Sequence, residues 1–231
     1  MFPLVNLLHS QIIMRRIYIE IQAFLKKRKN AADRKKLTNP NVSIITNHCM
    51  GGFMYHDLGL QFHSPTINLK IVPDEFVEFV EHIEYYLQQE VLECLDITSP
   101  CPVGMIPYKD GQGNIHIHFV HYKTFADGAR KWKERAQRVD LKNIVVFLTA
   151  RDGCEESTLQ RFENLPYQQR ICYTNEPHPE FPHCKYARLD NSKPLVGYIS
   201  DMVNIFGKRA FECNGFNYVE FINGKDQLPY K

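Results

Sequence analysis

One short run of residues constrains this chain more than any other. Ile144 to Thr149 reads IVVFLT, which has no charged residue and two adjacent valines. A strand that is apolar along its length is typical of a parallel strand covered by helices on both faces. Val42 to Thr46 and Ile171 to Thr174 are shorter runs of the same kind. These runs alternate with helical segments, which predicts an α/β fold with a mostly parallel, Rossmann-like sheet flanked by helices.

Each of these three strands ends in a threonine and continues into a polar turn. The segments are VSIITNHC, VVFLTARDGC and RICYTNEP, so Thr46, Thr149 and Thr174 occupy equivalent places. If the strands are parallel neighbours, the three threonines lie at the carboxyl edge of the sheet. Open α/β sheets bind their ligands at that edge. The turns that follow these strands are therefore where functional side chains are expected.

The first turn brings together an amide, an imidazole, a thiol and two glycines, at Asn47, His48, Cys49, Gly51 and Gly52. We expect ligand binding here, because glycines allow close approach to the backbone and a helix N-terminus offers free N–H groups to an anion. A thiol at a helix N-terminus can have a lowered pKa, which makes Cys49 a candidate nucleophile. The alternative is a tight turn in which Cys49 only packs. The pattern is neither G-x-G-x-x-G nor a P-loop.

The second turn carries Arg151 and Asp152 directly after the IVVFLT strand. Arg151 is suited to hold a phosphate or a carboxylate. Asp152 is suited to bind a sugar hydroxyl or a metal, or to act in catalysis. The alternative is that Asp152 caps the helix that begins near Cys154.

The segment IHIHFVHY at residues 115–122 contains three histidines, His116, His118 and His121. Strand alternation places His116 and His118 on one face and His121 on the other. Two histidines without a third ligand do not make a metal site, so none is predicted. His118 or His121 is a candidate for proton transfer. The alternative is a pair of hydrogen-bonded histidines at the rim of the sheet.

The remaining pattern predicts one main domain with a helical leader. Residues 1–40 form the leader, and residues 41–231 form a single α/β domain that divides into two sublobes near residue 140. Residues 103–122 are expected to form an antiparallel hairpin around the turn KDGQGN. Further strands are expected at 69–72, 91–97, 185–189 and 217–222, and a helix at 195–206.

The leader is strongly basic, with nine Lys and Arg residues against two acids in residues 1–36. Residues 10–29 have helical apolar spacing, so one expectation is an interfacial helix that touches anionic membrane through residues 10–36. The alternative is a helix that packs its apolar stripe on the domain. No nucleic-acid recognition motif accompanies the charge, so a nucleic-acid partner is not predicted.

The expected location is the cytoplasm, with possible attachment at the inner membrane face through the leader. No apolar run approaches the ~20 residues that span a bilayer, and the start lacks the pattern of a secretory signal. The seven cysteines are odd in number and contain no C-x-x-C pair. They are therefore expected to be reduced. The sequence indicates no particular cofactor.

Four segments carry a resemblance to a known family: SIITNHCMGG, SPTINLKIVPDEFVEFVEHIEYYL, IHFVHYKTFADGARKWKERAQRV and RDGC. Over roughly residues 41–222 the chain resembles a family of uncharacterised bacterial proteins that carry a domain of unknown function. Members are often labelled exopolysaccharide biosynthesis proteins. In that family an aromatic residue often follows the cysteine, where this chain has Met50. The resemblance implies surface or capsular polysaccharide assembly and no established catalytic residues.

Together these observations lead to one functional hypothesis and one alternative. The hypothesis is a glycosyl or acyl transferase that acts on an activated sugar or a polysaccharide precursor. Cys49, His118, His121 and Asp152 are its candidate catalytic residues. The alternative is a non-catalytic ligand-binding or assembly module of the polysaccharide machinery.

Overall fold

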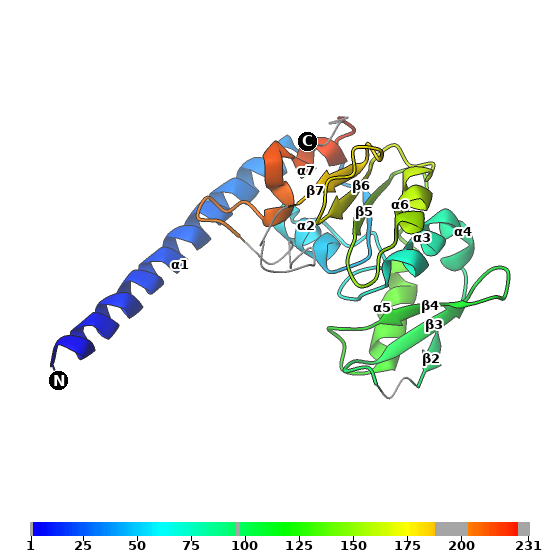
Figure 1. The fold of residues 1–231 in the computed structure, drawn as a ribbon, viewed down its shortest axis with the longest axis horizontal. Coiled ribbons are helices and arrows are strands. Elements are labelled where there is room, and N and C mark those ends of the chain that lie inside the picture. The colour runs from blue at the N-terminus through cyan, green and yellow to red at the C-terminus, as the bar shows by residue number, and fades with distance from the viewer. Residues whose placement is uncertain (1, 96–97, 188–202, 226–231) are drawn as a thin grey trace.

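The computed structural model describes residues 2–95, 98–187 and 203–225 and contains two β-sheets (Figure 1). The larger sheet has four parallel strands in the order β1-β5-β6-β7, and the smaller one is antiparallel with the order β2-β3-β4. The strands are β1 Ser43–Thr46, β2 Leu92–Cys94, β3 Val103–Pro107, β4 Asn114–His118, β5 Ile144–Thr149, β6 Arg170–Thr174 and β7 Cys184–Tyr186. The expected α/β fold with an antiparallel hairpin is confirmed.

The helices are α1 Phe2–Lys36, α2 Met50–Leu58, α3 Pro73–Glu81, α4 Ile83–Tyr86, α5 Phe125–Ala136, α6 Glu156–Glu163 and α7 Tyr218–Ile222, with a 3₁₀ helix η1 at Ala210–Gly215. Pro73 at the first turn and the acids beside it begin α3, because both suit a helix N-terminus. Gly59 ends α2 in the left-handed conformation, with φ of 69°.

Strand β5 is buried at all six positions, because helices cover both faces of the parallel sheet. Val146 and Leu148 belong to a core shared with α3, α5, α6 and the antiparallel sheet. Val145 and Phe147 belong to a second core shared with α2 and α7. The all-apolar pattern of this strand therefore identified its environment correctly.

The second sheet is shorter than the sequence indicated. Strand β4 ends at His118, and His121 lies in an exposed turn after it. The expected strand at 69–72 is only an isolated antiparallel bridge between Lys70 and His118. That bridge lies on the edge of β4 opposite β3 and brings the loop before α3 alongside the end of β4.

One strand expected near the C-terminus is a helix, and three other expected elements lie partly outside the described residues. In place of the strand expected at 217–222, Tyr218–Ile222 form the helix α7, because the Asn217 side chain accepts hydrogen bonds from the N–H groups of Val219 and Glu220 and caps the helix. Residues 195–202 of the expected helix lie outside the described residues, as do 188–189 of the expected strand and 96–97 of another. The described part, 203–206, is not helical, and Val203 forms a bridge with Arg209.

Helix α1 accounts for most of the expected leader of residues 1–40, and its N-terminal part extends away from the rest of the chain (Figure 1). Among the described helices, none combines the length and the apolar character that crossing a membrane requires. The division of the domain near residue 140 stays a prediction.

Candidate functional site

Three threonines stand at the carboxyl ends of adjacent parallel strands, as the sequence indicated. Strands β1, β5 and β6 are neighbours and end at Thr46, Thr149 and Thr174. The Thr46 hydroxyl donates to the carbonyl of His48 at 2.6 Å and accepts from the N–H of Gly51 at 3.3 Å. This side chain therefore fixes the turn between β1 and α2.

Asn47 joins the ends of β1 and β5. Its side-chain amide donates to the carbonyl of Thr149 at 3.1 Å, and its side-chain oxygen accepts from the Thr149 N–H at 2.9 Å. The Asn47 carbonyl accepts from the N–H of Ile71 at 3.1 Å. Asn47 is fully buried, so its polar atoms hold the two turns in register beneath the site.

His48 and Asp152 face each other across the two turns. The Nε2 atom of His48 lies 3.4 Å from Oδ2 of Asp152. Asp152 has a φ of 58°, a left-handed conformation that Asp tolerates better than most residues. It does not cap α6, because Glu155 is the N-cap residue of that helix. The strained backbone instead directs its carboxylate at His48.

The charges around this pair keep Asp152 ionised and His48 neutral. The contact with His48 and the positive charges of Lys70 and Arg151 lower the pKa of Asp152 to about 2, against the effect of burial. Burial lowers the pKa of His48, and the nearby Arg151 and Lys70 act in the same direction. In the tautomer that carries its proton on Nε2, the neutral imidazole presents that proton to the Asp152 carboxylate and Nδ1 keeps a lone pair.

Two bases complete the arrangement. Nζ of Lys70 lies 3.8 Å from Oδ2 of Asp152, and Nε of Arg151 lies 3.6 Å from the same oxygen. We call His48, Lys70, Arg151 and Asp152 the strand-end cluster. It brings together two basic side chains, one imidazole and one carboxylate. The side chains of Arg151, His48 and Asp152 are 15%, 18% and 24% exposed, so the charges are only partly screened by solvent.

Lys70 was missing from the residues that sequence reasoning selected. Lys70 and His118 exchange both backbone hydrogen bonds, at 2.9 and 2.8 Å. Directly opposed residues of an antiparallel ladder carry their side chains on the same face, so His118 lies on the Lys70 side. This pairing is long-range, and no local pattern in the segment NLKIVPD predicts it.

The other histidines separate into different environments. His116 lies on the same strand face as His118, as expected. The Nδ1 atom of His116 lies 2.9 Å from a carboxylate oxygen of Glu75. The Glu75 carboxylate also accepts from the His116 backbone N–H at 2.6 Å. His121 is exposed in its turn. In the described part of the chain, no three His, Cys, Asp or Glu side chains gather as a metal site would require.

The two glycines of the first turn are closely packed against protein atoms. A Cβ on Gly51 would lie 3.0 Å from Oγ1 of Thr46, and one on Gly52 would lie 3.3 Å from Oδ1 of Asn68. Gly51 therefore lets α2 approach the end of β1, and Gly52 lets it approach the loop at residues 67–68. Cys49 is half-buried at the N-cap position of α2, with no side-chain capping hydrogen bond.

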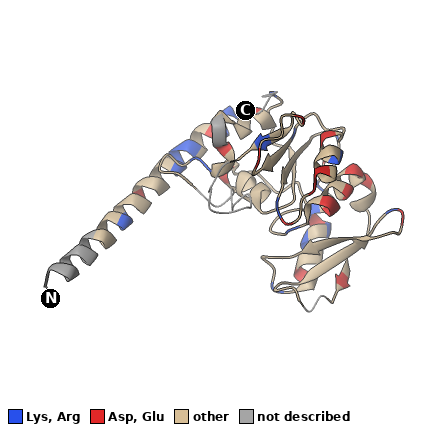
Figure 2. Cartoon of the chain, viewed as in Figure 1, with Lys and Arg blue, Asp and Glu red and all other residues tan. Residues whose placement is uncertain are grey.

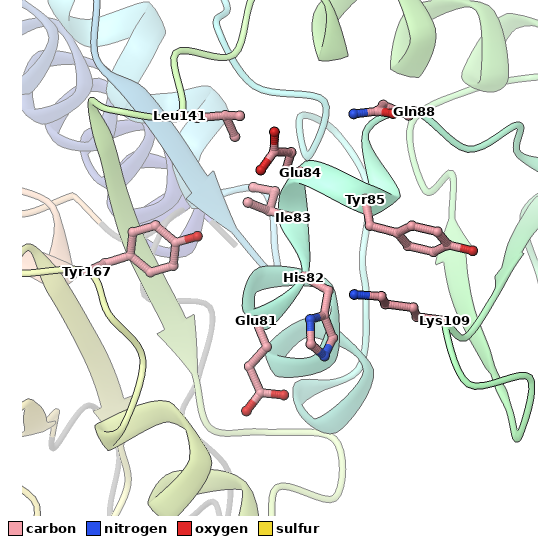
Figure 3. Close-up of a pocket in the computed structure, with 9 residues that line it drawn as sticks. All are labelled: Glu81, His82, Ile83, Glu84, Tyr85, Gln88, Lys109, Leu141 and Tyr167. Atoms are coloured by element: carbon pink, nitrogen blue, oxygen red, sulfur yellow. The ribbon is translucent and has the colours of Figure 1, made fainter.

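A separate hollow of about 500 Å³ lies beside α4 (Figure 3). Leu141 and Tyr167 line it and precede β5 and β6, so it lies toward the amino ends of these strands, at the opposite edge of the sheet from the strand-end cluster. The hydroxyl of Tyr167 donates to the carbonyl of Val80 on α3 at 3.2 Å. Acidic side chains gather on α3, α4 and α6 in this region (Figure 2), where Arg161 pairs with Asp74 and Glu81.

Two comparisons place the chain among known proteins. The family described as "Domain of unknown function (DUF1919)" matches residues 20–223. An uncharacterized protein of Haemophilus influenzae is 31% identical over 208 residues, which cover 88% of this chain and 97% of that protein. The family match includes both sheets, both turns of the strand-end cluster and the second half of α1.

Proposed function

We propose that this chain, which belongs to the family described as a domain of unknown function (DUF1919), is a transferase that acts on an activated sugar or polysaccharide precursor. The observation that carries the proposal is the strand-end cluster. It sets two bases and a histidine–carboxylate pair at the carboxyl edge of a parallel sheet. That edge is where open α/β sheets bind ligands.

The bases favour a substrate with a phosphate group. Lys70 and Arg151 bring two positive charges to one carboxylate, so the cluster retains a positive charge when Asp152 is ionised. Activated sugars carry a phosphate or a diphosphate as their leaving group. Partly buried Lys and Arg side chains are suited to hold such an anion and to stabilise the charge that develops on it.

The histidine–carboxylate pair supplies the proton transfer that such a reaction needs. An acceptor hydroxyl oxygen attacks the anomeric carbon, and the bond from that carbon to the phosphate oxygen breaks. The bonding electrons leave with the phosphate, opposite Lys70 and Arg151, while Nδ1 of His48 takes the hydroxyl proton. Asp152 holds the imidazole and stabilises its charged form, as the third group does in other nucleophile–base systems.

Polysaccharide assembly is the setting that fits this chemistry. The sequence resembles a family whose members are often labelled exopolysaccharide biosynthesis proteins, and polymer synthesis uses phosphate-activated sugars. Cys49 and His118 flank the cluster in this proposal, at the turn after β1 and on the Lys70 side of the ladder. A non-catalytic module that binds the same precursor is the second candidate, because the cluster also suits binding alone.

Binding and turnover measurements separate these possibilities. Isothermal titration with a panel of nucleotide sugars should give saturable binding that Arg151→Ala weakens at least 10-fold. His48→Gln should retain binding and lose sugar transfer. His56→Gln is the matched control, because His56 lies on α2 with its side chain 83% exposed. Binding without transfer by the unaltered chain favours the module. Binding that is unchanged in Arg151→Ala contradicts the site.

A further inference from the structure

Helix α1 consists of an anchored part and a projecting part. From Gln22 onward it contacts the rest of the chain. The Gln22 side chain donates to the carbonyl of Val203 at 2.7 Å, and Lys29 pairs with Glu212 at 2.8 Å. Gly207 packs so closely on the helix that a Cβ there would lie 2.5 Å from Cα of Lys26. Residues 11–21 are exposed at every position and extend away from the body (Figure 1).

The projecting part has a broad apolar face. At 100° per residue, one arc of the helix carries Ile13, Met14, Ile17, Tyr18, Ile21 and Phe24. Met14 is 71% exposed, Phe24 is 58% exposed, and the other four are between 45% and 49% exposed. Large apolar side chains gathered on one exposed face mark an interaction surface.

The spacing on this face is that of a helix-pairing seam. Met14, Tyr18 and Ile21 follow one another at intervals of four and three residues. This is the a/d spacing by which one helix packs against another, with Ile13 and Ile17 widening the face on its flank.

The charges favour a protein partner over a lipid surface. Lys26 contacts Asp57 at 3.4 Å and Lys29 contacts Glu212 at 2.8 Å, so carboxylates of the body neutralise part of the positive charge of the leader. Between residues 11 and 25 the charged residues are Arg15, Arg16 and Glu20, and Arg16 pairs with Glu20 at 3.2 Å. An interfacial helix has a strongly charged polar face rich in Lys and Arg, which this stretch lacks.

We propose that the projecting part of α1 pairs with the same helix of a second copy of this chain. The apolar face offers on the order of 1,000 Å² when two copies are counted, which is the area at which specific interfaces begin. The near-neutral charge of the stretch allows two copies to approach without strong repulsion. The body and its strand-end cluster remain outside this contact.

Substitutions on opposite arcs of the helix test the proposal. Sedimentation equilibrium of the full chain should show a dimer at micromolar concentration. Ile17→Glu/Ile21→Glu places two carboxylates on the apolar face, one on its flank and one in the seam, and should raise the dissociation constant at least about 100-fold, because each would be buried without a partner. Ile12→Glu/Ile19→Glu is the matched control, because these residues are 64% and 51% exposed on the other arc.

The dimer should persist in the control variant, and both variants should keep the circular dichroism of the unaltered chain. An unaltered chain that is monomeric at these concentrations, or a dimer that survives Ile17→Glu/Ile21→Glu, overturns the proposal. Flotation with phosphatidylglycerol vesicles tests whether the apolar face binds an anionic membrane in place of a second copy. A monomer that floats and loses flotation in Ile17→Glu/Ile21→Glu assigns the face to an anionic membrane instead.

Discussion

Replacing Asp152 with asparagine tests the electrostatics of the strand-end cluster. Asparagine removes the charge and keeps the size of the side chain. It also tolerates the left-handed backbone that Asp152 adopts at φ of 58°. Asp152→Ala would add backbone strain to the loss of charge, so it is the less informative substitution.

The expected effect follows from the pKa of Asp152, which the cluster lowers from 3.8 to about 2. A carboxyl group with a lower pKa in the folded state stabilises the fold at pH values above the unfolded pKa. The full shift corresponds to about 2 kcal/mol at pH 7. Because the side chain is 24% exposed, we expect Asp152→Asn to lower the free energy of unfolding by about 1–2 kcal/mol.

Urea unfolding as a function of pH measures this effect. The difference between the unaltered chain and Asp152→Asn should be constant from pH 7 to about 5 and should shrink as the pH falls through 3.8 toward 2. In the same variant the pKa of His48, followed by NMR, should fall further because the contact that raises it is lost. Equal stability of the two proteins at pH 7 refutes the electrostatic reasoning.

Three further predictions concern the packing that supports the site. Asn47→Ala should cost about 1–3 kcal/mol in urea unfolding, because it leaves the buried Thr149 N–H without its partner and removes one of the two hydrogen bonds to the Thr149 carbonyl, which keeps the one from the Arg151 N–H. A loss below about 0.5 kcal/mol would show that the two turns hold their register without Asn47. Gly51→Ala should lower the melting temperature more than Gly52→Ala. The new Cβ at Gly51 would lie 3.0 Å from Thr46, whereas the one at Gly52 would lie 3.3 Å from Asn68. A larger loss in Gly52→Ala would contradict this reasoning from the packing distances. Arg209→Met should cost about 3 kcal/mol in urea unfolding, because Arg209 pairs with Asp57 at 2.6 Å and both are buried. The double variant Arg209→Met/Asp57→Asn should recover part of that loss of stability. If it recovers none, the buried carboxylate of Asp57 is not the cause of the loss.

The parallel sheet could be predicted from the sequence because its signals are local. The run IVVFLT showed a strand buried on both faces, and the three strand-ending threonines showed which turns share an edge. These two patterns were enough to place His48 and Asp152 on the same side of the sheet.

The parts that were missed depend on short or long-range interactions. The segment NYVEFI is too short for its apolar pattern to separate a strand from a helix, and the cap by Asn217 decides for the helix. The strand expected to continue to residue 122 ends at His118, where the ladder partner is Lys70. Lys70 enters the site through that pairing, which links residues 48 apart in the sequence and leaves no periodic signal.

A crystal structure of the chain with a bound nucleotide sugar tests the central claim most directly. The proposal predicts that the diphosphate lies within hydrogen-bonding distance of Lys70 and Arg151, with the anomeric carbon on the His48 side. A diphosphate bound away from the ends of β1 and β5, for example in the hollow beside α4, would contradict the assignment of the strand-end cluster.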